Sequence, residues 1–151
     1  MTRGLIDKNR PCIITYPDDL VLLKHFPKKL VERHLVGVKK GCIATVVRVS
    51  KTRYAFGLVV TDDEGIVVDF EEKPFLPYPA NVGIYVLEPG AYEIIDQKIK
   101  LEEAPVEFEE TVVPELVKQR MLFSMTIPFE SWLPVNDEKS YKRALKVLEN
   151  L

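Results

Sequence analysis

The chain has 151 residues, of which 46% are hydrophobic and 29% are charged, and its formal net charge is −2. This length fits one domain, and the composition excludes a disordered chain, a collagen-like repeat and a disulfide-stapled miniprotein. The near balance of 21 basic and 23 acidic residues excludes the strongly basic surface of a nucleic-acid-binding protein.

The sequence carries no sign of a membrane span or of secretion. No apolar run approaches the roughly 18 residues that a spanning helix needs, and the first residues lack the apolar core of a signal peptide. Cys12 and Cys42 each lie in an apolar, strand-like run, which favours buried thiols over a disulfide or a redox pair. We therefore expect a cytoplasmic protein with no nucleic-acid or membrane partner. Few Gln and Asn beside abundant Glu, Lys and Val are a feature of thermophile proteins.

The first half of the chain alternates apolar runs with one helical stretch. Pro27 suits the first position of a helix, and His34 falls on the apolar face that follows it. An acidic turn ending in Gly65 separates two strand-like runs, which is typical of a β-hairpin. We predict strands at residues 11–16, 42–49, 55–61 and 66–70, and a helix at 28–36.

The second half predicts two strands and three helices. Pro114 lies inside an apolar helical pattern, and an interior proline costs about 3 kcal/mol, so we expect that helix to begin close to Thr111 or to be kinked. Asn136 or Asp137 caps the last helix, whose apolar residues repeat at helical spacing. The remaining predicted elements are strands at 82–87 and 122–128 and a helix after Gly90. This order predicts a mixed α/β domain with helices packed on a sheet.

Several short motifs follow one another between residues 54 and 141. They are YAFGLVV at 54–60, an acidic turn at 62–65, FEEKP at 70–74, NVGIYVL at 81–87, FEETVVPEL at 108–116 and WLPVNDEKSY at 132–141. In this order they resemble the sugar-phosphate nucleotidylyltransferases, which make nucleotide-diphosphate sugars from a nucleoside triphosphate and a sugar 1-phosphate. Residues 12–45, which include the pair Ala44 and Thr45, match that family less tightly. The resemblance implies a Rossmann-like nucleotidyltransferase fold, with Mg²⁺ as the cofactor.

The resemblance also assigns the sugar side of a site, to Gly57, Glu72, Lys73 and Asn81. Glu72 would accept hydrogen bonds from sugar hydroxyls, and Lys73 would meet the phosphate. If the segment is extended, these two side chains point to opposite sides; the alternative role for this Glu-Lys-Pro sequence is a solvated strand end. Gly57 would let the backbone approach the sugar ring, or it marks a bulge. Asn81 would bind a sugar hydroxyl, or it caps the turn before its strand.

The metal side of the site is incomplete in the sequence. Asp18 or Asp19 lies where a buried strand becomes a loop, a usual place for Mg²⁺ carboxylates in open α/β sheets; the alternative is a turn held by local Asx hydrogen bonds. The family carries a second metal aspartate two residues after its closing tryptophan, where this chain has Pro134, which lacks a side-chain oxygen.

The family's N-terminal Gly-rich loop is also missing. That loop cradles the triphosphate with backbone N–H groups, and the segment at residues 2–5 shares with it little more than Thr-Arg. We therefore expect residues 1–151 to form a single, partial nucleotidyltransferase domain that lacks the nucleotide loop, and we assign no catalytic residue.

These features predict a chain that supplies the sugar-phosphate half of a nucleotidyltransferase and is inactive alone. The alternative is a non-catalytic regulatory module that binds sugar phosphate or nucleotide sugar, or an assembly module that uses the fold as a scaffold. An incomplete sheet exposes a strand edge and an apolar face. We therefore expect a homodimer, or a heteromer with a chain that carries the nucleotide loop.

Overall fold

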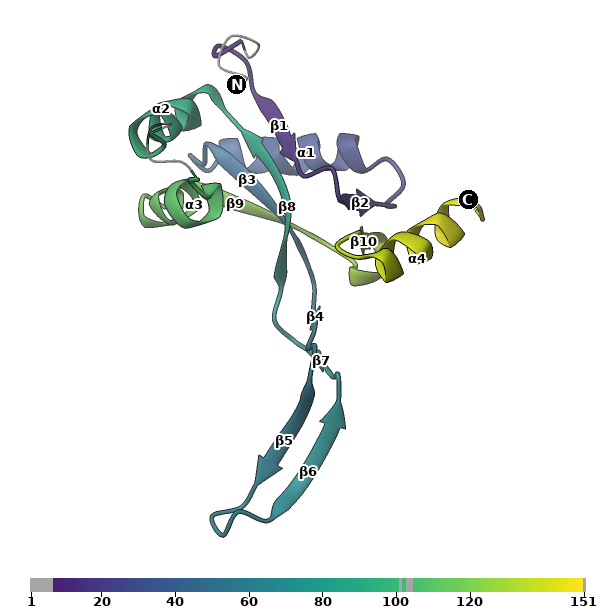
Figure 1. Cartoon of the computed structure of the whole chain (residues 1–151). Coiled ribbons are helices and arrows are strands. Elements are labelled where there is room, and N and C mark those ends of the chain that lie inside the picture. Colours follow the sequence, from purple (N-terminus) through teal and green to yellow (C-terminus); the bar gives the residue numbers. More distant parts are fainter. Residues whose placement is uncertain (1–6, 101, 103–104, 151) are drawn as a thin grey trace.

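A computed structural model describes residues 7–100, 102 and 105–150, so the segment at 2–5 lies outside the described residues. Figure 1 shows a body of sheet and helices from which a long hairpin projects. The body is built on a four-stranded sheet in the order β1-β8-β3-β9. These strands are β1 (Cys12–Thr15), β8 (Ala80–Leu87), β3 (Ala44–Val49) and β9 (Leu122–Ile127). The predicted mixed α/β class is confirmed.

The central sheet is mixed in direction. β8 runs antiparallel to both of its neighbours, β1 and β3, whereas β3 and β9 run parallel in register from Ala44 opposite Leu122 to Val49 opposite Ile127. β8 has six consecutive buried residues, from Val82 to Leu87. Such a run is typical of a strand with helices on both faces, so the sheet has a hydrophobic core on each side.

One face of the sheet is covered by α1 (Phe26–Val38), which carries Pro27 in its first turn as predicted. Leu30 lies in the core on this side, together with Val47, Ile84 and other buried residues. Arg33 fixes one edge of the helix to β9, because its Nε donates to the Ser124 carbonyl at 3.0 Å. Its guanidinium also lies 4.3 Å from the centre of the Phe123 ring.

The opposite face is covered by α2 (Pro89–Lys98) and α3 (Phe108–Lys118). The helix α3 begins at Phe108 rather than near Thr111, and Pro114 lies inside it. The Phe108 ring contacts Tyr85 edge-on at 5.1 Å, and further along the helix Val112 and Leu116 are fully buried. This packing offsets the cost of the interior proline.

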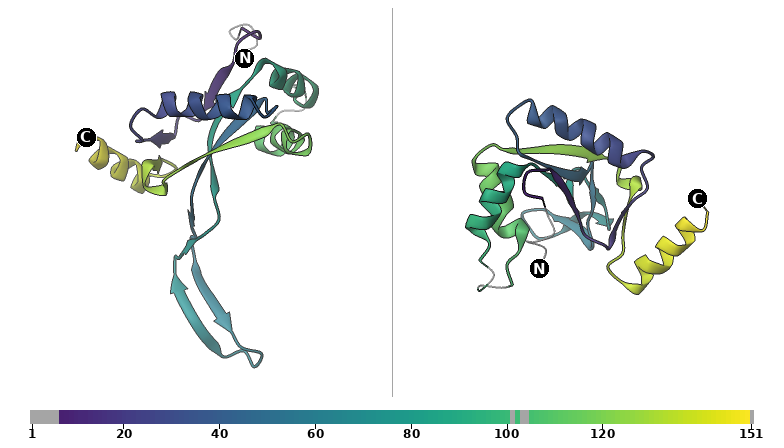
Figure 2. Two further views of the ribbon diagram at one scale, coloured as in Figure 1. Left: turned by 180° about the vertical axis from the view of Figure 1, so that it is seen from behind. Right: turned by 90° about the horizontal axis from the view of Figure 1, so that it is seen from above.

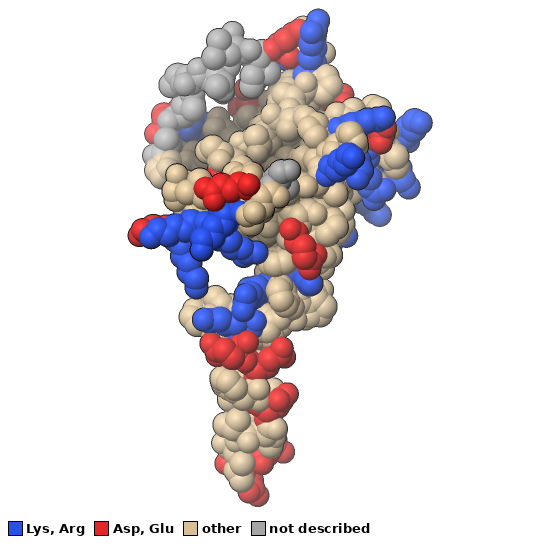
Figure 3. All heavy atoms as spheres, turned by 90° about the vertical axis from the view of Figure 1, so that its right-hand side faces the viewer, with Lys and Arg blue, Asp and Glu red and all other residues tan. Residues whose placement is uncertain are grey.

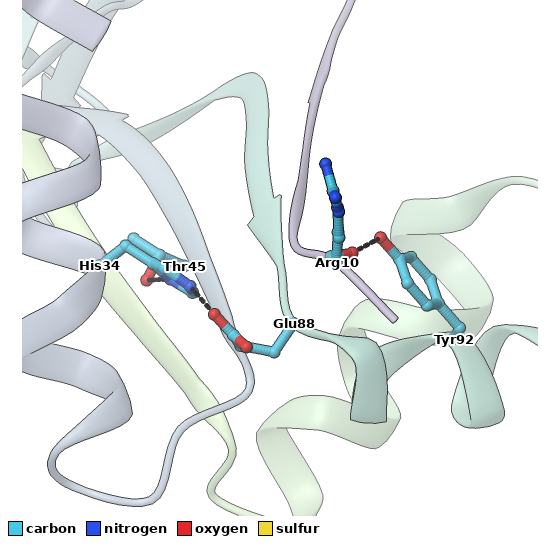
Figure 4. Close-up of polar contacts among 5 residues, drawn as sticks. All are labelled: Arg10, His34, Thr45, Glu88 and Tyr92. Atoms are coloured by element: carbon cyan, nitrogen blue, oxygen red, sulfur yellow. Dashed lines mark hydrogen bonds and ion pairs between the residues drawn. The ribbon is translucent and has the colours of Figure 1, made fainter. Parts of the chain in front are cut away.

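His34 joins three elements of the body (Figure 4). Its Nδ1 lies 2.9 Å from the Thr45 hydroxyl on β3, and its Nε2 lies 2.9 Å from Oε1 of Glu88, the residue before α2. The side chain is 3% exposed, so the prediction of a helix residue beside the core is confirmed. Figure 4 also shows the Tyr92 hydroxyl donating to the Arg10 carbonyl at 2.8 Å, which ties the start of the chain to α2.

The predicted hairpin is confirmed and projects away from the body (Figures 1 and 2). It consists of β5 (Gly57–Thr61) and β6 (Val67–Glu72), and residues 57–72 are here called the arm. Asp62 shapes its turn, because Oδ1 accepts from the backbone N–H of Glu64 and of Ile66. The arm joins the body through a neck formed by β4 (Thr52–Arg53) and β7 (Phe75–Leu76).

One side of the body is built from the C-terminal part of the chain together with a short strand from near its start. It consists of β2 (Asp19–Val21), a short 3₁₀ helix at Phe129–Ser131, β10 (Trp132–Pro134) and α4 (Glu138–Leu148), with β2 paired to β10. Asp137, rather than Asn136, caps α4: its carboxylate accepts from the Ser140 backbone N–H at 2.6 Å in a reciprocal capping box.

The cysteines and the helices can be compared with the predictions from the sequence. Cys12 and Cys42 are free thiols, as expected, but each is only partly buried. Within the described parts of the chain, no helix is long and apolar enough to cross a membrane.

Candidate functional site

The base of the arm brings together three of the residues predicted for sugar binding. Gly57 and Glu72 are direct cross-strand partners. A Cβ on Gly57 would lie 2.8 Å from the Phe70 ring and 2.9 Å from Glu72 Oε2, so a larger residue would displace both side chains. The irregularity in this ladder lies between Val60 and Thr61. Gly57 is therefore not a bulge residue, and its missing side chain leaves the space that the Phe70 ring and the Glu72 carboxylate occupy.

Lys73 follows directly after the arm and has a left-handed backbone, with φ of 50°. Its N–H donates to the Phe56 carbonyl at 3.2 Å, which turns the chain at the end of β6. Because the segment is not extended here, Glu72 and Lys73 do not point to opposite sides: Lys73 Nζ lies 3.8 Å from Glu72 Oε1. Both side chains are exposed, so the base of the arm presents an accessible carboxylate–ammonium pair.

Asn81 lies inside β8 rather than in a turn before it. Its Nδ2 donates to the Tyr85 hydroxyl at 2.6 Å, and its Oδ1 accepts from the Gly83 N–H at 3.0 Å. The amide therefore holds the local shape of β8 around Gly83, which has φ of 73°. A Cβ on Gly83 would overlap the Tyr16 ring, so glycine is required at this position both by conformation and by the close approach of Tyr16.

Two tyrosines converge on one carboxylate next to Asn81. The Tyr85 hydroxyl donates to Glu109 Oε1 at 3.1 Å, and the Tyr16 hydroxyl donates to Glu109 Oε2 at 2.9 Å. Burial, followed by the hydrogen bond and charge of Glu109, raises the pKa of Tyr16 to about 12. Burial also raises the pKa of Tyr85. Both phenols therefore stay neutral hydrogen-bond donors at physiological pH.

This network borders a hollow of about 350 Å³ on the α3 side of the sheet. Its described lining residues are Val46, Arg48, Pro79, Ala80, Asn81, Tyr85, Glu109, Val113 and Leu122. A guanidinium, an amide, a phenol and a carboxylate thus face one space, and such groups can bind hydroxyls and phosphate. Of the four residues predicted for the sugar, Asn81 alone is among those lining the hollow; the other three lie at the base of the arm.

Sequence reasoning gave no role to Tyr16, Arg48, Tyr85 or Glu109. Tyr85 and Glu109 do belong to motifs that were noted, namely Asn-x-Gly-x-Tyr and the FEETVVPEL stretch. Their approach depends on α3 packing over β8, which residue spacing along the chain does not reveal. No motif singled out Tyr16 or Arg48.

The two positions expected to hold metal carboxylates lie opposite each other. Asp19 in β2 pairs with Pro134 in β10, and the Asp18 carbonyl accepts from the Val135 N–H at 2.8 Å. Burial raises the pKa of Asp19, a hydrogen bond from the Trp132 indole lowers it, and the neighbouring Asp18 raises it again. The Trp132 Nε1 donates to Asp19 Oδ1 at 2.6 Å.

The residues present do not form a complete magnesium site. The described part of the chain contains no group of three or more His, Cys, Asp or Glu side chains placed to hold a metal ion. One oxygen of Asp19 already accepts from Trp132, and Pro134 offers no side-chain oxygen. Mg²⁺ prefers oxygen ligands and is often completed by substrate phosphates. The described residues of this chain therefore do not by themselves fit the Mg²⁺ that the resemblance implies.

Comparison with known proteins decides the family, because the nucleotidyl transferase family model matches residues 2–150. The chain belongs to the nucleotidyl transferase family. Among its relatives, the mannose-1-phosphate guanylyltransferase catalytic subunit beta of Drosophila melanogaster is 30% identical over 119 residues, covering 77% of this chain and 30% of that protein. The glucose-1-phosphate adenylyltransferase of Thermotoga maritima is 30% identical over 123 residues, covering 76% of this chain and 28% of that protein.

A solved structure shows the same fold. It is a Bacillus anthracis protein described as a glucose-1-phosphate thymidylyltransferase in complex with a sucrose, and it matches with a TM-score of 0.61 and 15% identity. The match covers 95% of this chain but 56% of the other. The resemblance identified from the motifs is thus confirmed at the level of family and fold. The matches cover less than a third of the length of the two relatives named above.

Proposed function

We propose that this chain supplies the sugar-phosphate side of an enzyme that makes nucleotide-diphosphate sugars, and that it is inactive alone. In this proposal it works in the cytoplasm with a chain that carries the Gly-rich nucleotide loop. The main support is the base of the arm, where the exposed pair of Glu72 and Lys73 lies beside Gly57.

Each group at this base has a part in the proposed reaction. Lys73 Nζ binds the phosphate of a sugar 1-phosphate, and the Glu72 carboxylate accepts hydrogen bonds from sugar hydroxyls, while the missing side chain of Gly57 leaves the space that this carboxylate and the Phe70 ring need. The sugar phosphate oxygen then attacks the α-phosphorus of the triphosphate. A new P–O bond forms as the bond to the departing pyrophosphate breaks. Positioning two polyanions is most of the work in such a reaction.

Pro134 supports the second half of the proposal, inactivity of the isolated chain. The proline lies opposite Asp19, at the position where the family resemblance places a second carboxylate. Removing a metal carboxylate together with the triphosphate cradle removes groups that stabilise charge in the transition state. In this proposal a partner chain supplies these groups.

The proposal is tested by calorimetric titration with glucose 1-phosphate and mannose 1-phosphate. We expect Lys73→Ala to weaken binding about 10- to 100-fold, since a hydrogen bond to a charged group contributes about 1.5–3 kcal/mol. Lys40→Ala removes another exposed cation, on the body, and is the matched control, expected to bind as the wild type does. Absence of binding to either sugar phosphate, or equal binding by both variants, contradicts the proposal.

A non-catalytic module that senses or assembles around sugar phosphates is the second candidate, and Pro134 is the observation that favours it. The two candidates differ when the chain is mixed with a protein that carries the Gly-rich loop. Release of pyrophosphate from triphosphate and sugar 1-phosphate by the mixture supports the split enzyme. Binding of sugar phosphate without release in any mixture supports the sensing module.

A further inference from the structure

The arm exposes apolar side chains on both of its faces. On one face Val59 and Phe70 are cross-strand partners and are 54% and 58% exposed. This face also carries Gly57 and Glu72 at its base. On the other face Leu58 and Val60 are exposed, and each lies opposite an acidic residue, Glu71 or Asp69 respectively. We call this second face, formed by Leu58, Val60, Asp69 and Glu71, the acidic face of the arm.

Among the described elements, the arm packs extensively on none but itself. β5 and β6 pair with each other, and neither makes an extensive contact with another described element. An isolated two-stranded hairpin is marginally stable in water, and clustered exposed apolar side chains usually mark an interaction surface. The arm therefore has the features of a segment that is completed by another molecule.

The negative charge of the arm indicates the charge that the partner surface must carry. Residues 54–72 contain no Lys or Arg and carry six carboxylates, at Asp62, Asp63, Glu64, Asp69, Glu71 and Glu72. Figure 3 shows acidic side chains spread along the projecting arm, while the basic side chains gather on the neck and the body. A surface that packs on the arm must therefore be basic as well as apolar.

The helix α4 offers such a surface. Its cations Lys139, Lys142, Arg143 and Lys146 recur at helical spacing on one side, where they line a hollow of about 1070 Å³. A neighbouring strip of Tyr141, Leu145 and Leu148 is exposed, and within α4 only Ala144 is buried. This apolar strip borders the cations as Leu58 and Val60 border the acids on the arm.

We propose that the acidic face of the arm packs on α4 of a second copy of this chain. Leu58 and Val60 contact the strip of Tyr141, Leu145 and Leu148, while Asp69 and Glu71 pair with Lys142 and Lys146. The arm extends away from its own α4 (Figures 1 and 2), so the contact forms between copies. A two-fold axis gives two identical contacts per dimer.

Reversal of charge on each surface tests the contact. We expect the wild type to sediment as a dimer whose dissociation constant rises at least tenfold between low and high salt, since screening weakens exposed charge pairs. Asp69→Lys with Glu71→Lys, or Lys142→Glu with Lys146→Glu, should each give monomers. The matched control is Lys39→Glu with Lys40→Glu, which reverses two exposed cations elsewhere on the body and should leave the dimer intact.

Mixing the two reversed variants gives the decisive result. In a mixed dimer both contacts again join opposite charges, so we expect an equimolar mixture of the two monomeric variants to recover the dimer. Circular dichroism of each variant establishes that it is folded. A monomeric wild type, a dimer that survives both reversals, or a mixture that stays monomeric overturns the proposal.

This test is independent of the proposed function. The reversed residues do not include Gly57, Glu72 or Lys73, so both reversed variants should bind sugar 1-phosphate as the wild type does. A wild type that forms the dimer but binds neither sugar phosphate contradicts the proposed function alone, and a wild type that binds sugar 1-phosphate but stays monomeric contradicts the arm contact alone.

Discussion

Asp19 and Pro134 lie directly opposite each other in the short ladder of β2 and β10. Directly opposed residues in an antiparallel pair have Cβ atoms about 4.5–5.5 Å apart. Two carboxylates at these positions could share one cation, whereas an aspartate opposite a proline cannot supply a second carboxylate ligand. A carboxylate at position 134 would therefore face Asp19 directly across the ladder.

Restoring a carboxylate at this pair should create divalent-metal affinity. We predict that Pro134→Asp binds Mg²⁺ or Mn²⁺ at least about tenfold more tightly than the wild type, because affinity for hard cations rises with the number of charged oxygen ligands. Calorimetric titration with each metal measures the change. Pro134→Asn is the matched control, since it adds an oxygen without a charge. Equal affinities of the Asp and Asn variants would contradict a metal-binding role for a carboxylate opposite Asp19.

The close packing of Tyr16 on Gly83 should appear in stability. Gly83→Ala places a Cβ in the Tyr16 ring at a positive φ, whereas Gly65→Ala has a similar φ of 85° and nothing within 4 Å. We predict that Gly65→Ala lowers the free energy of unfolding by about 1 kcal/mol and that Gly83→Ala lowers it by a further 1–3 kcal/mol or so. Urea unfolding measures both values. Equal losses would mean that Tyr16 does not rest on β8.

The carboxylate shared by two tyrosines should control their ionisation. We predict that Glu109→Gln lowers the pKa of Tyr16 from about 12 towards 10, because it removes a negative charge beside the phenol. Phenolate absorbance during a pH titration reports the change, and Glu110→Gln on the exposed side of α3 is the control.

The same shift has a consequence for stability. The pKa of Tyr16 is raised in the folded chain, so its contribution to folding is fully present below pH 10 and is lost as the pH rises through about 12. The Glu109→Gln variant should lose less stability over this window than the wild type. An unchanged profile would show that burial alone sets the pKa of Tyr16.

Features encoded by neighbouring residues could be predicted from the sequence. The hairpin followed from the acidic turn ending in Gly65, and the first helix followed from Pro27 and the apolar face that includes His34. The family followed from the order of several short motifs along the chain, and the family model matches residues 2–150. The signals for the hairpin and for the first helix each lie within a few residues of the element that they specify.

Features that depend on tertiary contact could not be predicted. Lys73 has a left-handed backbone because its N–H bonds to Phe56 across the hairpin, and no local residue pattern signals this. The partners of His34 lie on two other elements, at Thr45 and Glu88. Glu109 meets Tyr16 across a separation of 93 residues. Asn81 looked equally suited to a ligand or a turn, and packing placed it inside a strand.

The position of the arm relative to the body depends on the few residues of the neck. Gly57, Glu72 and Lys73 lie beyond the paired strands β4 and β7, where Thr52 faces Leu76 and Arg53 faces Phe75. The Phe75 ring is braced edge-on against Phe129 of the body at 5.2 Å. Any tilt at the neck would move the carboxylate of Glu72 and the ammonium of Lys73 together relative to the body. The orientation of the base of the arm is therefore set by residues outside it.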